Sequence, residues 1–300
     1  MKAVDFDYVR AGSVDEVCRM LDDAAEDGKV IAGGQTLVPL LAMRLTRPAL
    51  LVDINAVPGL QGIEGTTDAL LLGSCTRQAE AERSELVCLQ LPLLRKGLSF
   101  VGHVQTRNRG TIGGSIANAD PSAEIGLVML TLGGSVVTRS SDGDTIVPAD
   151  EFFLGPMITT LMPNEFIRQV QFPVWQVEGW QGTGFQETSP RRSDFALASA
   201  AVQLVLDKDG ICRRAAIGIG GAAATPVRID AAAEGLVGTT VSEADITAAA
   251  DVVREMVDPE SDLHASADYR RRLAATLAAR AIREARAEAR RKGEGPDVEA

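Results

Sequence analysis

The sequence has few of the residues that bind metals or form large aromatic surfaces. Its 300 residues include two histidines, four cysteines and only 4% aromatic residues. The cysteines, Cys18, Cys75, Cys88 and Cys212, lie far apart and form no C-x-x-C pair. Because iron–sulfur and zinc sites need clustered thiolates or imidazoles, we expect buried, reduced thiols and no metal site. Any metal or cluster used with this protein is therefore expected on another chain.

The chain also lacks a long apolar run and a surplus of basic residues. No stretch of about 18 apolar residues occurs, and residues 1–7 contain no apolar signal region. The net charge of −11 at pH 7 disfavours contact with the phosphates of nucleic acid. We expect a cytoplasmic protein with no membrane span and no nucleic-acid partner.

Two glycine pairs occur in similar settings. Ala32-Gly33-Gly34-Gln35-Thr36 lies between two short apolar runs, which predicts a strand, a glycine turn and a helix that Thr36 caps. Thr111-Ile112-Gly113-Gly114-Ser115 repeats the chemistry. Glycine permits positive φ and close approach to the main chain, and the free N–H groups at a helix start attract anions. The two segments together suggest one ligand with two phosphates, although a bare Gly-Gly pair is more often a structural turn.

The apolar pattern predicts three domains, and a chain of this length can give each of them a core. Residues 1–57 contain a β-α-β pattern, and residues 58–176 predict a second α/β domain with a hairpin around Ser141-Asp142-Gly143-Asp144. Residues 177–292 form the third domain. It begins with a linker and continues with strands at 195–206 and 211–219 and helices at 242–256 and 266–291. Residues 293–300 are polar and predict a disordered tail.

The residues around the glycine pairs resemble the flavin loops of the FAD-binding subunits of molybdenum hydroxylases. The segment Ala32-Gly33-Gly34-Gln35-Thr36-Leu37-Val38-Pro39, followed by Met43-Arg44-Leu45, resembles the first loop. The segment Gly110-Thr111-Ile112-Gly113-Gly114-Ser115-Ile116-Ala117-Asn118-Ala119-Asp120-Pro121 resembles the second. Their spacing and the chain length also match, so the resemblance covers essentially all of the sequence. The separate medium subunits of carbon monoxide dehydrogenase and of bacterial N-heterocycle dehydrogenases are the most similar types.

The resemblance implies an α+β fold and a set of cofactor contacts. The fold has two small α/β FAD-binding subdomains of the PCMH/VAO type, followed by a C-terminal domain with an antiparallel sheet and helices. Non-covalent FAD lies in the cleft between the first two domains, with its pyrophosphate held by residues 32–36 and 111–115. Ser115 stands where the family more often has Asn.

Three further contacts are implied outside the glycine segments. Glu124, where the family usually has Asp, would contact the ribose or adenine end. Leu161 would lend its backbone to the flavin, and Gln186, where some relatives have Lys, would approach the ring from the third domain. Glu124 and Leu161 have equally good structural explanations, as a solvated acid at a helix start and as a packing residue.

The resemblance further implies an electron-transfer subunit with no catalytic residue of its own. A molybdenum cofactor on a large subunit would oxidise a small molecule, such as an N-heterocycle or a purine. Two-iron-two-sulfur clusters on a small subunit would pass electrons to this FAD, and an external acceptor would receive them. The complex would be a dimer of heterotrimers.

We expect the small subunit to dock beside the flavin on two segments, residues 103–109 and 180–194. These segments carry Arg107, Arg109, Arg191 and Arg192 in an otherwise acidic chain. Two alternatives to electron transfer stay open. One is a self-contained FAD oxidase or reductase, which needs an acid/base pair that the sequence does not reveal. The other is a non-enzymatic nucleotide-binding module.

Overall fold

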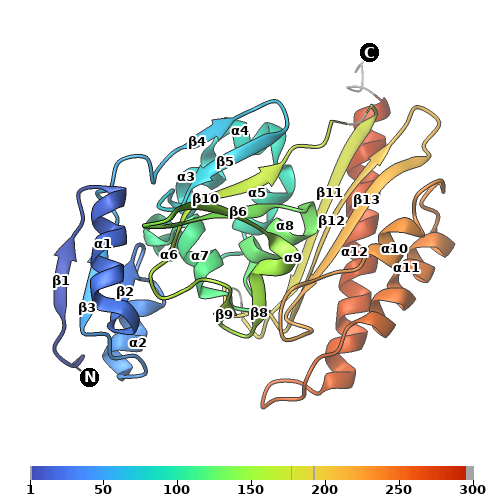
Figure 1. The fold of residues 1–300 in the computed structure, drawn as a ribbon. Coiled ribbons are helices and arrows are strands. Elements are labelled where there is room, and N and C mark those ends of the chain that lie inside the picture. Colours follow the sequence, from blue (N-terminus) through green and yellow to red (C-terminus); the bar gives the residue numbers. More distant parts are fainter. Residues whose placement is uncertain (1, 177, 192, 295–300) are drawn as a thin grey trace.

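The computed structural model describes residues 2–176, 178–191 and 193–294. Three larger sheets follow one another along the chain, and the N-terminus and the last helix lie at opposite ends of the molecule (Figure 1). Within these residues, no helix has the length and apolar character needed to cross a membrane. Each larger sheet is thus built mainly from one continuous stretch of the sequence.

The first sheet is parallel and has the order β1-β3-β2. Its strands are β1 (Asp7–Arg10), β2 (Gly28–Ile31) and β3 (Leu50–Asp53). Helix α1 (Val14–Ala24) packs on the sheet, a 3-10 turn (Ala25–Asp27) follows it, and α2 (Leu37–Met43) joins β2 to β3. The β-α-β pattern is thus confirmed, whereas the exposed and charged β1 was not predicted.

The second sheet has the order β4-β5-β10-β6-β7 and is antiparallel. Its strands are β4 (Ile63–Gly65), β5 (Ala69–Gly73), β6 (Ser135–Ser140), β7 (Gly143–Pro148) and β10 (Phe166–Pro173). The predicted hairpin between β6 and β7 is confirmed. A short hairpin, β8 (Phe153–Gly155) with β9 (Ile158–Thr159), lies outside this sheet.

Seven helices of the described chain accompany the second sheet. They are α3 (Gln78–Arg83), α4 (Glu85–Gln90), α5 (Pro92–Leu98), α6 (Val104–Arg109), α7 (Ile112–Asn118), α8 (Glu124–Leu132) and α9 (Ala149–Phe152). Every residue of α8 after Glu124 is buried, so this helix is apolar on all sides. Its apolar side chains belong to a large core that extends into the third sheet.

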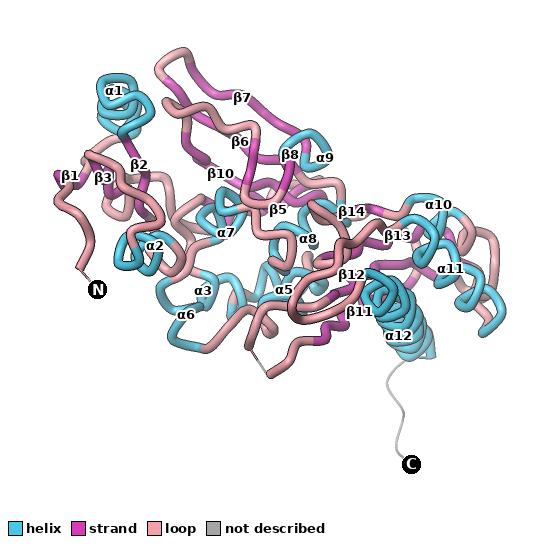
Figure 2. The backbone as a smooth tube through the Cα atoms, turned by 90° about the horizontal axis from the view of Figure 1, so that it is seen from below, coloured by secondary structure: helices cyan, strands magenta, loops and turns pink. Residues whose placement is uncertain are grey.

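The third sheet is antiparallel and lies between two helical layers. Its strands are β11 (Trp180–Thr188), β12 (Ala198–Leu206), β13 (Cys212–Gly220) and β14 (Val227–Arg228). The long α12 (Ala267–Glu294) packs on β11 and β12, while α5 and α8 contact the sheet from the second domain (Figure 2). Helices α10 (Asp230–Glu234) and α11 (Glu243–Met256) complete the outer layer. Because β12 is covered on both faces, it is buried throughout and reads as a continuous apolar run.

Three expectations for single segments are wrong. Residues 180–188, expected within a linker and a docking loop, form β11. Helix α12 continues through Gly293 and Glu294, because Gly293 packs against the ring of Trp180; residues 295–300 lie outside the described residues. All four cysteines are free, but Cys88 is exposed, since α4 turns the neighbouring Val87 into the core instead.

Candidate functional site

The first glycine segment joins β2 to α2 and has a row of backbone amides without partners. Gly34 has a φ of +70°, the left-handed region that glycine tolerates. In the described part of the chain, no acceptor binds the amide N–H groups of residues 33–36, although the carbonyls of Gly34 and Thr36 accept bonds from α2. Consecutive free N–H groups of this kind attract an anion. The segment therefore has the donors that a phosphate group needs.

Thr36 stands at the N-cap position of α2 but does not cap it. Its side chain makes no capping hydrogen bond, because its backbone is helical, with φ −103° and ψ −47°. A capping hydroxyl needs extended backbone at that position. The prediction of a Thr36 cap is wrong, and the exposed side chain is left beside the free amides.

The second glycine segment is the start of a helix and not a loop. Thr111 caps α7, and its Oγ1 accepts from the amide of Gly114 at 3.1 Å. The amide of Gly113 donates to the carbonyl of Ser74 at 2.9 Å. A Cβ on Gly113 would lie 2.5 Å from the Cβ of Ser74, so this glycine lets α7 pack against the end of β5. Gly113 thus makes its close approach to another part of the protein, and the cofactor contacts of residues 111–115 stay a prediction.

The two segments meet at Gly33. A Cβ on Gly33 would lie 2.5 Å from the carbonyl oxygen of Arg109 and 2.8 Å from the Cα of Gly110, so the two backbones are in contact. Beside this contact is a cavity of about 410 Å³. It is lined by Tyr8, Ile31, Ala32, Gly33, Gly34, Gln35, Val38, Pro39, Asp53, Asn55 and Arg109. The structure thus brings residues 32–35 together with the exposed Arg109, which has the charge that a diphosphate attracts.

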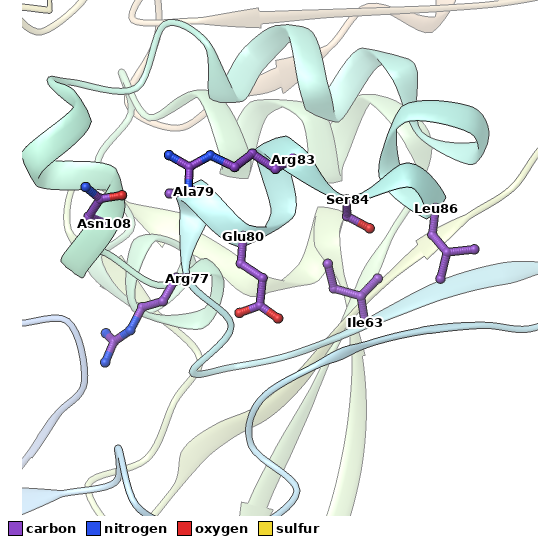
Figure 3. Close-up of a pocket in the computed structure, with 8 residues that line it drawn as sticks. All are labelled: Ile63, Arg77, Ala79, Glu80, Arg83, Ser84, Leu86 and Asn108. Atoms are coloured by element: carbon purple, nitrogen blue, oxygen red, sulfur yellow. The ribbon is translucent and has the colours of Figure 1, made fainter.

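A second cavity, of about 620 Å³, lies along α3 and the end of β4 (Figure 3). It is lined by Ile63, Arg77, Ala79, Glu80, Arg83, Ser84, Leu86 and Asn108. None of the predicted cofactor contacts lines it. Arg77 extends away from the Glu80 side chain (Figure 3), and its guanidinium binds residues around the first cavity.

Glu124 begins α8 and lies close to two further carboxyl groups. Burial raises the pKa of Glu124 to about 7; the charge of Asp120 raises it and that of Arg107 lowers it. Burial and the charge of Glu124 raise the pKa of Glu187, on β11, to about 8. Glu187 Oε2 is buried, with no hydrogen-bond partner among the described residues. Burial and mutual repulsion thus favour the protonated forms of the Glu124 and Glu187 carboxyl groups near neutral pH.

Gln186 and Leu161 make other contacts in this structure. Gln186 Nε2 donates to Glu284 Oε2 of α12 at 2.8 Å, because neighbouring residues of a strand point to opposite faces. Phe185 instead belongs to the core shared with the second domain. Leu161 packs against the same core, and its amide donates to Thr159 Oγ1 at 3.2 Å. Their flavin contacts stay predictions.

The residues that line the first cavity were only partly anticipated. Asp53 and Asn55 come at the end of β3, at the edge where the carboxyl ends of the parallel strands meet. Ligands of α/β sheets bind at such an edge, so the polar pair after an apolar strand was a usable signal. Glu187 had no comparable signal, because its neighbours come from distant segments.

The predicted docking arginines differ in their surroundings. Arg107 pairs with Glu82 at 2.9 Å and donates to the carbonyls of residues 101 and 102. Arg191 lies 3.5 Å from Asp194, and Arg192 lies outside the described residues. Among these arginines, Arg109 is the one that the structure places on the first cavity.

Comparison with known proteins decides the family. Residues 4–175 match the FAD binding domain in molybdopterin dehydrogenase, and residues 184–285 match the CO dehydrogenase flavoprotein C-terminal domain. The chain belongs to the FAD-binding medium subunits of the molybdenum hydroxylases. The predicted family, enzyme class and fold are therefore confirmed: it is the flavoprotein subunit of a molybdopterin-dependent oxidoreductase.

Individual relatives cover most or all of the chain. It is 42% identical to the 6-hydroxypseudooxynicotine dehydrogenase complex subunit alpha of Paenarthrobacter nicotinovorans over 228 residues, 76% of each chain. It is 30% identical to the carbon monoxide dehydrogenase medium chain of Afipia carboxidovorans over 285 residues, 95% of this chain and 98% of that one. Quinoline 2-oxidoreductase from Pseudomonas putida 86 superposes with a TM-score of 0.91 at 35% identity, over 96% of this chain and 99% of that one.

Membership fixes the cofactor and the kind of assembly. FAD is the cofactor of this chain, and the family is consistent with a molybdenum cofactor and iron–sulfur clusters on partner subunits. The chain is the medium subunit of a complex that also has large and small subunits. The residues at the first cavity fit a diphosphate, since residues 33–35, whose amides have no partner in the described chain, line it together with the positively charged Arg109.

Proposed function

We propose that this chain is the electron-transfer subunit of a heterotrimer that hydroxylates an N-heterocyclic small molecule. The argument for this substrate class is the order of the identities. The chain is 42% identical to a subunit of a nicotine-derivative dehydrogenase and 35% identical to quinoline 2-oxidoreductase, but 30% identical to a carbon monoxide dehydrogenase chain. Both of the more similar proteins are named for substrates with a nitrogen-containing ring. We also propose a dimer of heterotrimers, an external electron acceptor and a cytoplasmic location, which the four free thiols favour.

The single observation that carries the cofactor site is the run of free amides at residues 33–36, of which residues 33–35 line the first cavity together with Arg109. These amides would donate to the diphosphate oxygens, and the guanidinium would offset part of their charge. FAD, when bound, supplies the redox chemistry, and the protein orients it and tunes its potential. Residues 111–115, at the start of α7, would contact the diphosphate from the opposite side.

The other predicted contacts belong to the same proposal. Glu124 would accept from the ribose hydroxyls, Leu161 would offer its backbone and Gln186 would approach the ring. Each of the ranges 1–57, 58–176 and 177–292 contains one of the three larger sheets, which supports the proposed division into two FAD-binding subdomains and a C-terminal domain.

The proposal is tested by following flavin absorbance in the isolated chain and in the complex purified with its partner subunits. With quinoline or nicotine as probes, the flavin of the complex should bleach, while that of the isolated chain should stay oxidised. Carbon monoxide should bleach neither. Bleaching of the isolated chain by an N-heterocycle would instead support a self-contained flavoenzyme. A purified chain with no flavin bands would support the nucleotide-binding module.

A further inference from the structure

A single side chain, Asn55, connects the first glycine segment to the edge of its own sheet and to the second domain. It is half-buried and follows β3. Its side-chain nitrogen donates to the carbonyl of Ala32 at 2.8 Å and to Asp53 Oδ1 at 2.6 Å. Its side-chain oxygen accepts from Arg77 at 2.8 Å. Every polar atom of the Asn55 side chain is therefore used to hold another part of the protein.

Arg77 completes the connection from the second domain. It stands directly before α3, and its second terminal nitrogen donates to the carbonyl of Arg109 at 2.5 Å. That carbonyl is the group on which Gly33 rests, because a Cβ on Gly33 would lie 2.5 Å from it. Asn55 therefore binds the carbonyl of Ala32, directly before Gly33. Arg77 binds the carbonyl of Arg109, against which Gly33 packs.

Asp53 fixes the orientation of Asn55. It is 5% exposed, and it accepts from the Tyr8 hydroxyl and from both the backbone and side-chain nitrogens of Asn55. Burial alone would raise the pKa of Asp53, but these hydrogen bonds outweigh it, and the pKa lies below its ordinary value. Because an ionised carboxylate can only accept, the Asn55 nitrogen must face Asp53, which turns the Asn55 oxygen toward Arg77.

We propose that Asn55 and Arg77 form a clamp that sets the spacing between residues 32–36 and residues 109–110, and so aligns the free amides with the diphosphate of FAD. Both are positioning residues, since neither has to touch the cofactor. A cradle held in its binding geometry loses less conformational freedom when the ligand binds, which raises affinity. This inference rests on the proposed function, because it takes residues 33–36 as the diphosphate site.

The test titrates the FAD-free full chain with FAD and with ADP, in the wild type and in Asn55→Ala, Arg77→Met and Arg77→Lys. We expect Asn55→Ala and Arg77→Met to raise the Kd for FAD at least tenfold, and the Kd for ADP by a similar factor, because ADP has the same diphosphate. Arg77→Lys should lose less affinity for FAD than Arg77→Met, because an ammonium group can still donate to one of the two oxygens, Asn55 Oδ1 or the carbonyl oxygen of Arg109. The matched control is Arg83→Met, which removes an exposed arginine from the far end of the adjacent helix α3 and should change neither Kd more than twofold.

A readout beyond affinity separates a clamp from general loosening. At saturating FAD, the flavin spectrum and midpoint potential of the variants should equal those of the wild type, because the clamp acts on the diphosphate and not on the ring. The double variant Asn55→Ala with Arg77→Met should bind FAD about as weakly as the weaker single variant, since both changes remove one shared contact.

Several results would overturn the clamp. One is a wild-type Kd in Asn55→Ala or in Arg77→Met; the second variant keeps the test decisive if the first does not fold. Another is weaker binding with a shifted potential, which would indicate a disturbed fold. A wild-type chain that binds no FAD would overturn the proposed function together with the clamp. Normal wild-type binding with unaffected variants would overturn the clamp alone.

Discussion

At the scale of single residues, Gly33 and Gly113 exclude a side chain for different reasons. A Cβ on Gly33 would push against the backbone of Arg109 at the edge of the cavity, whereas a Cβ on Gly113 would push against Ser74 in the interior. Of the four glycines in the two pairs, only Gly34 has a positive φ. Gly33 therefore allows the backbone of residues 109–110 to contact the first glycine segment, and Gly113 allows α7 to pack against Ser74.

We expect Gly33→Ala to weaken FAD binding at least tenfold, because its Cβ would push residues 109–110 away from the first glycine segment. Gly113→Ala should lower the melting temperature by several degrees, because overpacking in a well-packed interior costs about 1–3 kcal/mol. Titration with FAD and thermal scans of both variants check this. Gly12→Ala is the control, since its added Cβ would meet nothing closer than a Glu16 oxygen at 3.4 Å. Unchanged FAD affinity in Gly33→Ala would contradict the placement of the diphosphate.

Glu187 predicts a pH dependence of stability. Its pKa rises from the ordinary 4.5 to about 8 in the folded protein, so the folded state retains a proton that the unfolded state loses. The contribution of Glu187 to the free energy of unfolding should be fully present below about pH 4.5, decrease as the pH rises, and level off above about pH 8. Glu187→Gln keeps the neutral form at every pH and should be more stable than the wild type at pH 9 by about 1 kcal/mol or more.

The measurement is urea unfolding of the FAD-free protein at pH 5, 7 and 9. Glu26→Gln, which changes an exposed carboxyl group, should retain the wild-type slope with pH. Parallel curves for Glu187→Gln and the wild type would show that the Glu187 carboxyl is ionised in the folded state at neutral pH.

At this scale, the sequence predicted the first glycine segment but not its surroundings. The amides of residues 33–36 could be anticipated, because a glycine pair between a strand and a helix has a local signature. Asn55, Arg77 and Glu187 could not be assigned roles, since each acts through partners that are distant in the sequence. For the second segment, Gly113 approaches Ser74, and sequence alone does not say whether a glycine makes room for a ligand or for the protein.

At the scale of elements, the packing of α12 on β11 depends on two glycines. A Cβ on Gly182 would lie 1.9 Å from the carbonyl oxygen of Ala285, and one on Gly184 would lie 2.0 Å from that of Ala281. No side chain fits between the strand and the helix at these points. This also explains why β11 was missed, because glycine and polar residues hide the apolar alternation of a strand.

We expect Gly184→Ala to destabilise the protein by about 3 kcal/mol, because the helix must move away from the strand. Gly235→Ala is the matched control: its added Cβ would lie 3.4 Å from the nearest atom and its φ is −61°. That change should stay within about 1 kcal/mol of the wild type, in the stabilising direction. Urea unfolding of both variants measures the difference. If Gly184→Ala unfolded at the same urea concentration as the wild type, α12 would not pack on β11 as closely as the structure shows.

At the scale of the whole molecule, Lys96 ties the second domain to the last helix. From α5, its ammonium group reaches Glu284 at 2.6 Å, Glu288 at 2.8 Å and the carbonyl of Thr183 at 2.6 Å. Burial alone would raise the pKa of Glu288, but hydrogen bonds from Lys292 and Lys96 lower it to about 2. The third sheet is thus fixed to the FAD-binding part by charge as well as by the shared core.

Lys96→Met should lower the free energy of unfolding by roughly 3 kcal/mol, because it leaves two partly buried carboxylates short of a partner. Arg213→Met breaks a more exposed pair with Asp207 and should cost less than about 1 kcal/mol. Chemical unfolding at pH 7 compares them. Equal effects of the two substitutions would contradict a special role for Lys96 in joining the domains.

The central claim for the whole molecule is that this chain contributes FAD, and no metal, to the complex. No group of three or more metal-ligating side chains comes together within residues 2–176, 178–191 and 193–294. The most direct measurement is the cofactor content of the purified chain, by acid precipitation followed by flavin and metal analysis. We predict about one FAD per chain, released into the supernatant, with iron and molybdenum far below stoichiometry. A chain without flavin, flavin retained in the protein pellet, or stoichiometric iron would contradict the claim.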